Sequence, residues 1–182
     1  MRGFFQELYD SYHTSLYQFI FYMVKEKELA EDLIQEVYIK VLKSYHTFKG
    51  DSSEKTWLFS IARHVVIDYF RKQSSKKSRI MEYFDFGEKG HIMKDNQPLP
   101  EEIALQNDEM KRIYQCLDLC TVDQKSVLVL RYIQSFSIQE TADILGWSVS
   151  KVKTTQHRAI KALKVLLEEE GKEDNPNGSQ RV

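Results

Sequence analysis

Residues that interrupt helices are scarce in this sequence of 182 residues, which contains only seven glycines and three prolines. Segments in which apolar and polar residues alternate are also few, so half-buried β-strands are not indicated. Apolar residues recur instead at intervals of three and four along most of the chain, which is the spacing of one face of a helix. We therefore predict an all-α protein.

Cysteine is scarce as well, because Cys116 and Cys120 are the only two and lie four positions apart on an expected helix. No cysteine or histidine cluster completes a ligand set with them, so we expect neither a metal site nor a cofactor. We interpret the pair as small buried residues. A redox pair, or half of a metal site, is the less favoured alternative.

Long apolar runs are also missing. The most apolar early stretch, residues 16–24, is too short to cross a bilayer. Glu7 and Asp10 come early, with no cleavage-type signal before them. We expect no signal peptide, no direct membrane insertion and a cytoplasmic location.

Charge of one sign is not in excess, since the formal net charge is −1, but the charges are segregated. Residues 49–80 contain eight Lys/Arg and three Asp/Glu, and residues 110–167 contain nine and four. Residues 81–109, between them, contain two and eight. Two basic segments with an acidic connector are typical of a protein that binds a polyanion at two separate places.

Residues 137–163 have the pattern of a helix-turn-helix. Ser137 followed by Glu140 is a capping box, which predicts that a helix begins at the residue after Ser137. Gly146 is where that helix is expected to end, and Ser148 can cap the next one.

The second of these helices is expected to expose Lys153, Thr154, His157 and Arg158 on one face, because residues three and four apart are neighbours. Such side chains can donate and accept hydrogen bonds in the DNA major groove. The alternative is an ordinary helical hairpin with a solvated polar face.

The rest of the chain is divided by the same periodicity. Further helices are predicted at about residues 4–24, 29–45, 56–73, 101–119 and 122–134, the last opened by a capping box of Thr121 and Gln124. The pattern fades where Gly, Pro, Asn and acids accumulate. The predicted organisation is a domain at 1–73, a flexible acidic linker at 74–100 with a short helix near 80–86, a domain at 101–170 and a disordered tail at 171–182.

Three segments in this order resemble bacterial RNA polymerase sigma factors of the extracytoplasmic-function (ECF) type, within the sigma-70 family. Residues 30–50 (AEDLIQEVYIKVLKSYHTFKG) look like the helix that binds core polymerase. Residues 56–73 (TWLFSIARHVVIDYFRKQ) are similar to the promoter-melting segment, and the helix-turn-helix to the −35-reading module. The similarity covers nearly the whole chain and points to the sigma-X branch of Bacillus-type bacteria.

The resemblance implies a transcription initiation factor, and not an enzyme, that binds RNA polymerase core and directs it to promoter DNA in a cell-envelope stress regulon. It also implies a cognate, membrane-anchored anti-sigma protein. The implied core-binding residues are Asp32, Gln35 and Glu36. The implied −10 contacts are Gly50, Asp51, Ser52, Ser53, Trp57, Arg63, His64, Arg71 and Lys72. The implied −35 contacts are Ser150, Lys151, Lys153, Thr154, His157 and Arg158.

The polar loop at 50–55 corresponds to a family loop that captures a base flipped from the −10 strand, which short polar side chains suit. The sequence departs from the family's usual residues at His64, Trp147, Ser148 and Ser150. The first departure leaves the −10 base preference open, and the others leave open the fine geometry of −35 recognition.

Two other functions compete with this interpretation. A stand-alone transcriptional regulator would need a sensing site, which the sequence does not show, and would bind duplex DNA by itself. An enzyme would need convergent catalytic groups. The five histidines are scattered, and no carboxylates have metal-ligand spacing.

Overall fold

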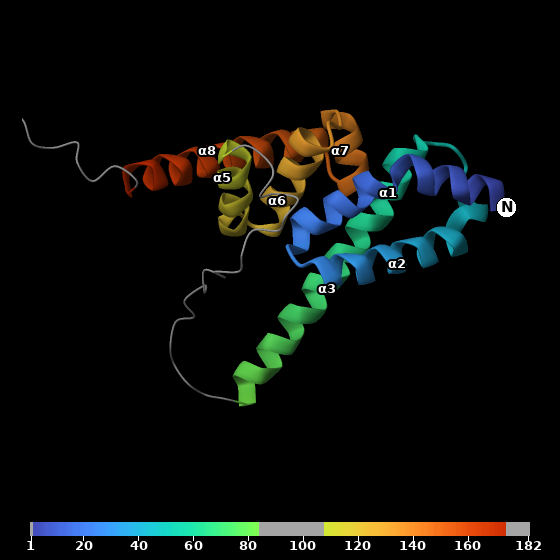
Figure 1. Ribbon diagram of the computed structural model, residues 1–182, viewed down its shortest axis with the longest axis horizontal. Coiled ribbons are helices and arrows are strands. Elements are labelled where there is room, and N and C mark those ends of the chain that lie inside the picture. Colours follow the sequence, from blue (N-terminus) through green and yellow to red (C-terminus); the bar gives the residue numbers. More distant parts are fainter. Residues whose placement is uncertain (1, 84–107, 174–182) are drawn as a thin grey trace, which may run out of the picture. The chain divides into compact units, whose positions relative to one another are not determined.

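The computed structural model describes residues 2–83 and 108–173, and all regular structure within these ranges is helical (Figure 1). The prediction of an all-α protein is confirmed. The chain divides into two compact units, residues 1–98 and 99–182. None of the helices in the described ranges is long and apolar enough to span a membrane.

The first unit is a bundle of three helices in which each helix packs against the other two. They are α1 (Arg2–Val24), α2 (Lys27–Ser44) and α3 (Glu54–Tyr83), with a 3-10 turn, η1 (Tyr45–Thr47), after α2. The rings of Phe19 and Phe59 meet in the core with their centroids 5.6 Å apart. Residues without exposed area include Leu16, Phe19, Ile20, Val37, Leu58 and Phe59.

An aromatic cluster fixes α1 against α2. His13 stacks on Tyr9 at 4.4 Å between ring centroids, and its Nδ1 lies 2.9 Å from the Tyr38 hydroxyl. Burial, and to a lesser degree the neighbouring Tyr9, raises the pKa of Tyr38. The raised pKa stabilises the protonated form of the hydroxyl that takes part in this hydrogen bond.

The third helix is longer than the sequence predicted. We expected it to end near Gln73 and a linker to begin at residue 74, but α3 continues to Tyr83. The polar segment after Gln73 loses its apolar periodicity without containing a glycine or proline, so nothing in it stops the helix. Ser75 fits into the helix by donating its hydroxyl to the Arg71 carbonyl at 3.1 Å. The rest of the expected linker, residues 84–100, lies outside the described ranges.

The second unit packs its last helix against three others. Its elements are α5 (Asp108–Cys116), the 3-10 turn η2 (Leu117–Leu119), α6 (Val122–Leu128), the π-helical turn η3 (Val129–Ile133), α7 (Ile138–Leu145) and α8 (Val149–Glu173). Val152 and Ala159 of α8 have no exposed area. The disordered tail was predicted to start at 171, but residues 171–173 are helical, because α8 continues to Glu173, where the described range ends.

The helix boundaries of this unit follow the capping residues. Both expected capping boxes are present, Thr121 with Gln124 and Ser137 with Glu140, each with reciprocal side-chain hydrogen bonds. Each box satisfies two backbone N–H groups that the helix itself leaves unpaired. The helix start predicted after Ser137 is confirmed.

Neither cysteine forms a disulfide and both are buried, which confirms their interpretation as small core residues. The Cys120 thiol points at the Cys116 carbonyl oxygen, 3.8 Å away. Within the described ranges, no three His, Cys, Asp or Glu side chains are placed to hold a metal ion.

Replacement of Gly146, the residue that ends α7, should separate backbone strain from packing. Gly146 has φ +65°, and a Cβ there would meet nothing within 4 Å. We expect Gly146→Ala to lower the stability of the second unit by about 1 kcal/mol, from the left-handed backbone alone. Gly146→Asn should lose less, because asparagine tolerates this conformation.

The measurement is urea unfolding followed by Trp147 fluorescence in a Trp57→Phe background, which leaves a single tryptophan in the second unit. Equal losses for the alanine and asparagine variants would contradict the backbone explanation.

Candidate nucleic-acid interface

The turn between α7 and α8 is built by three hydrogen bonds. Gly146 is left-handed, and its N–H donates to the Asp143 carbonyl at 3.3 Å. The N–H of Trp147 donates to the Ala142 carbonyl at 3.0 Å, a pattern that closes a helix C-terminus. Ser148 then accepts from the N–H of Lys151 at 3.1 Å and starts α8, as predicted.

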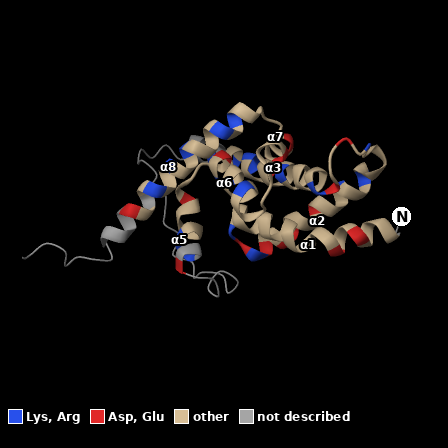
Figure 2. Ribbon diagram, turned by 90° about the horizontal axis from the view of Figure 1, so that it is seen from above, with Lys and Arg blue, Asp and Glu red and all other residues tan. Residues whose placement is uncertain are grey.

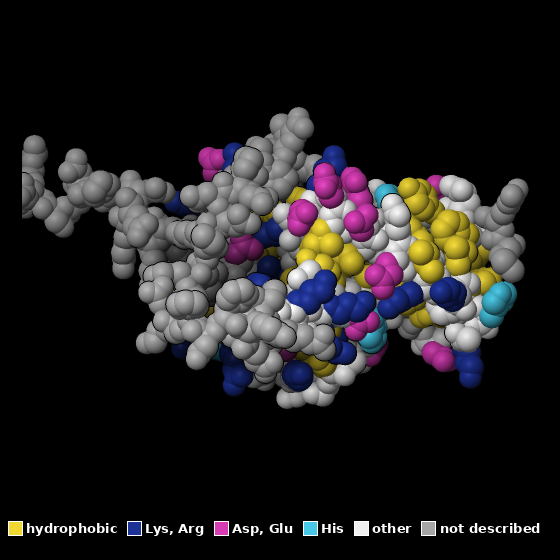
Figure 3. All heavy atoms as spheres, turned by 90° about the horizontal axis from the view of Figure 1, so that it is seen from below, with side chains coloured by type: hydrophobic (Ala, Val, Ile, Leu, Met, Phe, Trp, Pro, Cys, Tyr) yellow, Lys and Arg dark blue, Asp and Glu magenta, His cyan; other side chains and the backbone are white. Residues whose placement is uncertain are grey.

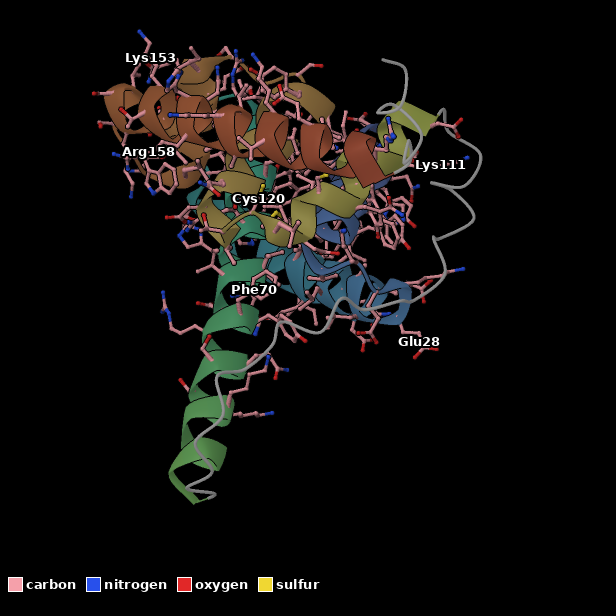
Figure 4. The ribbon with its side chains drawn as sticks, turned by 90° about the vertical axis from the view of Figure 1, so that its left-hand side faces the viewer. Glu28, Phe70, Lys111, Cys120, Lys153 and Arg158 are labelled. Carbon is pink, nitrogen blue, oxygen red and sulfur yellow. The ribbon has the colours of Figure 1, made fainter. Side chains whose placement is uncertain are left out.

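The polar face of α8 is exposed, as the periodicity predicted. Val152 and Ala159 are buried on the opposite side of the helix. The side chains of Lys153 and Arg158 project outward from α8 (Figure 4), and Lys and Arg recur along this helix (Figure 2). The structure brings together on this exposed surface all six expected −35 residues: Ser150, Lys151, Lys153, Thr154, His157 and Arg158. We call these six residues the α8 stripe.

Lys161 extends the α8 stripe and was missed in the sequence. It follows Thr154 by seven residues, which is close to two helical turns, and it is exposed. The seven-residue spacing alone was sufficient to identify it.

Arg131, which was also missed in the sequence, anchors the side of α8 that faces the rest of the unit. Its Nε donates to Gln156 Oε1 at 3.0 Å, and its Nη1 donates to the Phe136 carbonyl. The guanidinium thus joins the π-helical turn, the segment before α7 and α8. Arg131 and Gln156 are 25 positions apart, and no local pattern in the sequence signals their contact.

A second polar face lies on α3. Trp57, His64 and Arg71 recur at seven-residue intervals and share one side of the helix, with Lys72 beside them. The side chain of Arg71 is 75% exposed. Arg63 is half-buried and lies at the edge of this face opposite to Lys72.

Part of the loop before α3 serves to cap that helix. Gly50 adopts φ +76°, which turns the chain. Ser53 Oγ accepts from the Thr56 N–H at 3.1 Å and donates to Thr56 Oγ1 at 3.0 Å. Ser53 therefore caps α3. Asp51 is exposed and Ser52 half-buried.

Trp57 has one ring face covered within the protein. Its ring stacks on Phe48 with centroids 4.7 Å apart and planes inclined at 28°. An unpaired base can stack only on an open aromatic face, so at most one face of Trp57 serves that role.

The exposed side of α2 combines acidic and apolar residues. Asp32 and Gln35 are exposed and Glu36 is half-buried. Ile39 and Leu42, which were missed in the sequence, are each 52% exposed and follow Gln35 by four and seven residues. The sequence could have identified them as apolar residues that lie outside the buried stripe of α2. Hydrophobic side chains on the surface of the first unit lie among charged ones (Figure 3).

A chain of ion pairs connects this side of α2 to the polar face of α3. Lys40 Nζ lies 3.6 Å from Glu36 and 3.7 Å from Asp68, and Asp68 lies 3.8 Å from Arg71. The partners are largely solvated, so each pair contributes little to stability. The pair of Lys40 and Asp68 crosses between the two helices, whereas Glu36 and Arg71 each pair with a residue of their own helix.

Comparisons with known proteins match both units. The sigma-70 region 2 model matches residues 8–76, and the sigma-70 region 4 model matches residues 110–163. The ECF RNA polymerase sigma factor SigX of Bacillus subtilis is 56% identical over 181 residues, which cover 98% of this chain and 92% of SigX. The chain belongs to the ECF sigma factors. The resemblance seen in the sequence is confirmed.

Other relatives support the same family assignment. The sigma factor YlaC of Bacillus subtilis is 32% identical over 159 residues, 87% of this chain and 89% of YlaC. The solved sigma factor RpoE from Bartonella quintana, in complex with the anti-sigma factor NepR, has a TM-score of 0.66 and 26% identity over 92% of this chain and 98% of RpoE. CnrH, at 20% identity, shows the same fold with a TM-score of 0.68 over 93% of this chain and 90% of CnrH.

Membership defines the class of activity. ECF sigma factors are transcription initiation factors that bind RNA polymerase and promoter DNA, and they are not enzymes. In this sigma factor the region 2 match runs from α1 through α2 into α3, and the region 4 match runs from α5 into α8 and includes the helix-turn-helix.

The cap at Ser53 generates a stability prediction. We expect Ser53→Ala to destabilise the first unit by about 1 kcal/mol, because the Thr56 N–H loses its acceptor. Ser53→Asp should keep the cap, and Ser52→Ala, which removes no cap, is the matched control. Urea unfolding followed by Trp57 fluorescence in a Trp147→Phe background measures the effect. A loss no larger than that of Ser52→Ala would show that Ser53 does not stabilise α3.

Proposed function

We propose that this ECF sigma factor joins RNA polymerase core through α2, reads the −10 element with the α3 face and its preceding loop, and reads the −35 element with the α8 stripe. The first two roles fall to the predicted domain 1–73 and the third to the domain 101–170. The protein acts in the cytoplasm, where the polymerase transcribes, on the promoters of a cell-envelope stress regulon.

The observation that carries the proposal is the division of α8 into a buried side and an exposed polar side. Thr154, His157 and Arg158 have no part in the core, so they are available to a partner. A helix that follows a tight turn and exposes hydrogen-bonding side chains from its first turn onward has the geometry used in the major groove.

The α2 surface supports the polymerase-binding role. Asp32 and Gln35 supply charge and hydrogen-bonding groups that give register with a basic partner. The exposed Ile39 and Leu42 supply apolar area, which contributes to affinity on burial. An interface that combines the two is typical of protein partners.

Regulation by an anti-sigma protein is part of the proposal. RpoE of Bartonella quintana, which shares this fold at 26% identity, was solved with its anti-sigma factor NepR. We propose a cognate anti-sigma protein for this chain as well, anchored in the membrane so that an envelope signal can release the sigma factor.

A charge reversal tests the polymerase contact. We expect Asp32→Lys combined with Glu36→Lys to weaken core binding about tenfold or more, because a complementary charge pair becomes a repulsive one. Glu7→Lys with Asp10→Lys, two exposed acids on α1, makes the same change in net charge elsewhere. Titration with fluorescently labelled core polymerase measures affinity, and circular dichroism checks helix content. Equal affinity for both double variants would exclude α2 as the site.

Two substitutions in the α8 stripe test DNA reading. Arg158→Ala should relax preference at one or two base pairs of the −35 element, by about 1–3 kcal/mol of discrimination. Lys153, on the edge of the stripe, is placed to meet a phosphate, so Lys153→Ala should weaken all promoters similarly and reduce the salt slope by about 0.9. Holoenzyme binding to a promoter library at several salt concentrations measures both. Wild-type selectivity in the first variant and a wild-type slope in the second would contradict these roles.

A further inference from the structure

A cation–π contact connects the turn of the helix-turn-helix to the first turn of α8. Lys151 Nζ lies 3.9 Å from the centroid of the Trp147 ring. Trp147 is half-buried, whereas Lys151 is exposed. The negative face of an aromatic ring attracts a cation, and indole does so most strongly. The contact restrains a side chain that otherwise moves freely in solvent.

The backbone on both sides of the contact is fixed. Trp147 is held by its N–H bond to the Ala142 carbonyl, and Lys151 by its N–H bond to Ser148 Oγ. The two side chains therefore start from anchored positions on either side of the helix cap. Only the lysine stem has to be ordered for the ring and the ammonium to meet.

The charge distribution of the helix alone disfavours a lysine at position 151. The first turn of a helix carries partial positive charge, which repels a cation. No acidic residue in the first turn of α8 compensates for Lys151. The indole offsets part of this cost, which gives a physical reason for a tryptophan at position 147.

We propose that Trp147 is a positioning residue that holds the Lys151 ammonium ready for a DNA phosphate beside the −35 element. The inference rests on the proposed function. Lys151 precedes Thr154 by three residues and Arg158 by seven, so it lies at the N-terminal end of the α8 stripe, where a recognition helix enters the groove. An ammonium already restrained by the ring loses less side-chain entropy when it meets the phosphate.

The contact itself is tested on the free chain. In a Trp57→Phe background Trp147 is the only tryptophan. Lys151→Met removes the cation and keeps the length of the side chain, so it should shift the Trp147 emission. Lys153→Met makes the same chemical change two residues along and should leave the emission unchanged. Identical spectra for both variants would overturn the proposal before any polymerase is added.

The role is tested with holoenzyme, using as probe a promoter fragment recovered by the wild-type protein from fragmented genomic DNA. Trp147→Leu should lower affinity about two- to fivefold, the usual contribution of an exposed cation–π contact. Its salt slope should stay at the wild-type value, because no charge is lost. Lys151→Met should reduce the salt slope by about 0.9, because one phosphate contact is lost. Trp147→Phe keeps a ring and should restore most of the affinity.

The double variant separates positioning from packing. Adding Trp147→Leu to Lys151→Met should cost nothing further, because the tryptophan acts through the lysine. An equal loss from Trp147→Leu in both backgrounds would overturn the proposal in favour of a packing role. A wild-type affinity and slope for Lys151→Met would also overturn it. Arg158→Ala, measured on the same probe, decides separately whether the α8 stripe reads the −35 element.

Discussion

Both units depend on burying one apolar side of each helix, because the described residues contain no strand and no disulfide that stabilises them otherwise. This constraint determines which residues remain outside. In α3 the buried side holds Leu58 and Val65, so Trp57, His64 and Arg71 face away from the core. In α8 the buried Val152 and Ala159 place Thr154 and Arg158 outward in the same way. The surfaces proposed to bind DNA are thus a consequence of core packing.

Weaker local interactions determine where each exposed face begins. Gly146 reverses the chain, and Ser148 caps α8 at a defined residue. A shift of that cap by one residue would rotate the α8 stripe by about 100° and replace its members. Arg131 then ties α8 to the preceding turn through Gln156. Each such hydrogen bond contributes only about 1 kcal/mol, but together they select one register for the recognition surface.

The helix boundaries in the helix-turn-helix were predictable because their signals are local. Ser137, Glu140 and Gly146 act within a few residues of where they stand, and the helical period then placed the α8 stripe. The end of α3 was mispredicted, because a polar segment without glycine or proline weakens the apolar pattern without stopping the helix. Contacts between distant segments, such as Arg131 with Gln156 and Lys40 with Asp68, have no local signal. The roles of the site residues involve DNA and polymerase, and they stay predictions.

The central claim is that α3 and α8 lie at different promoter elements in the same holoenzyme. The most direct measurement is DNA cleavage by an iron chelate attached to an introduced thiol, at Thr154→Cys in one variant and at His64→Cys in another. Cys116 and Cys120 are buried, so the chelate should attach to the introduced thiol, and the unsubstituted chain is the control. The account predicts cuts around the −35 element from residue 154 and around the −10 element from residue 64. Cuts at the same element from both positions, or at exchanged elements, would contradict it.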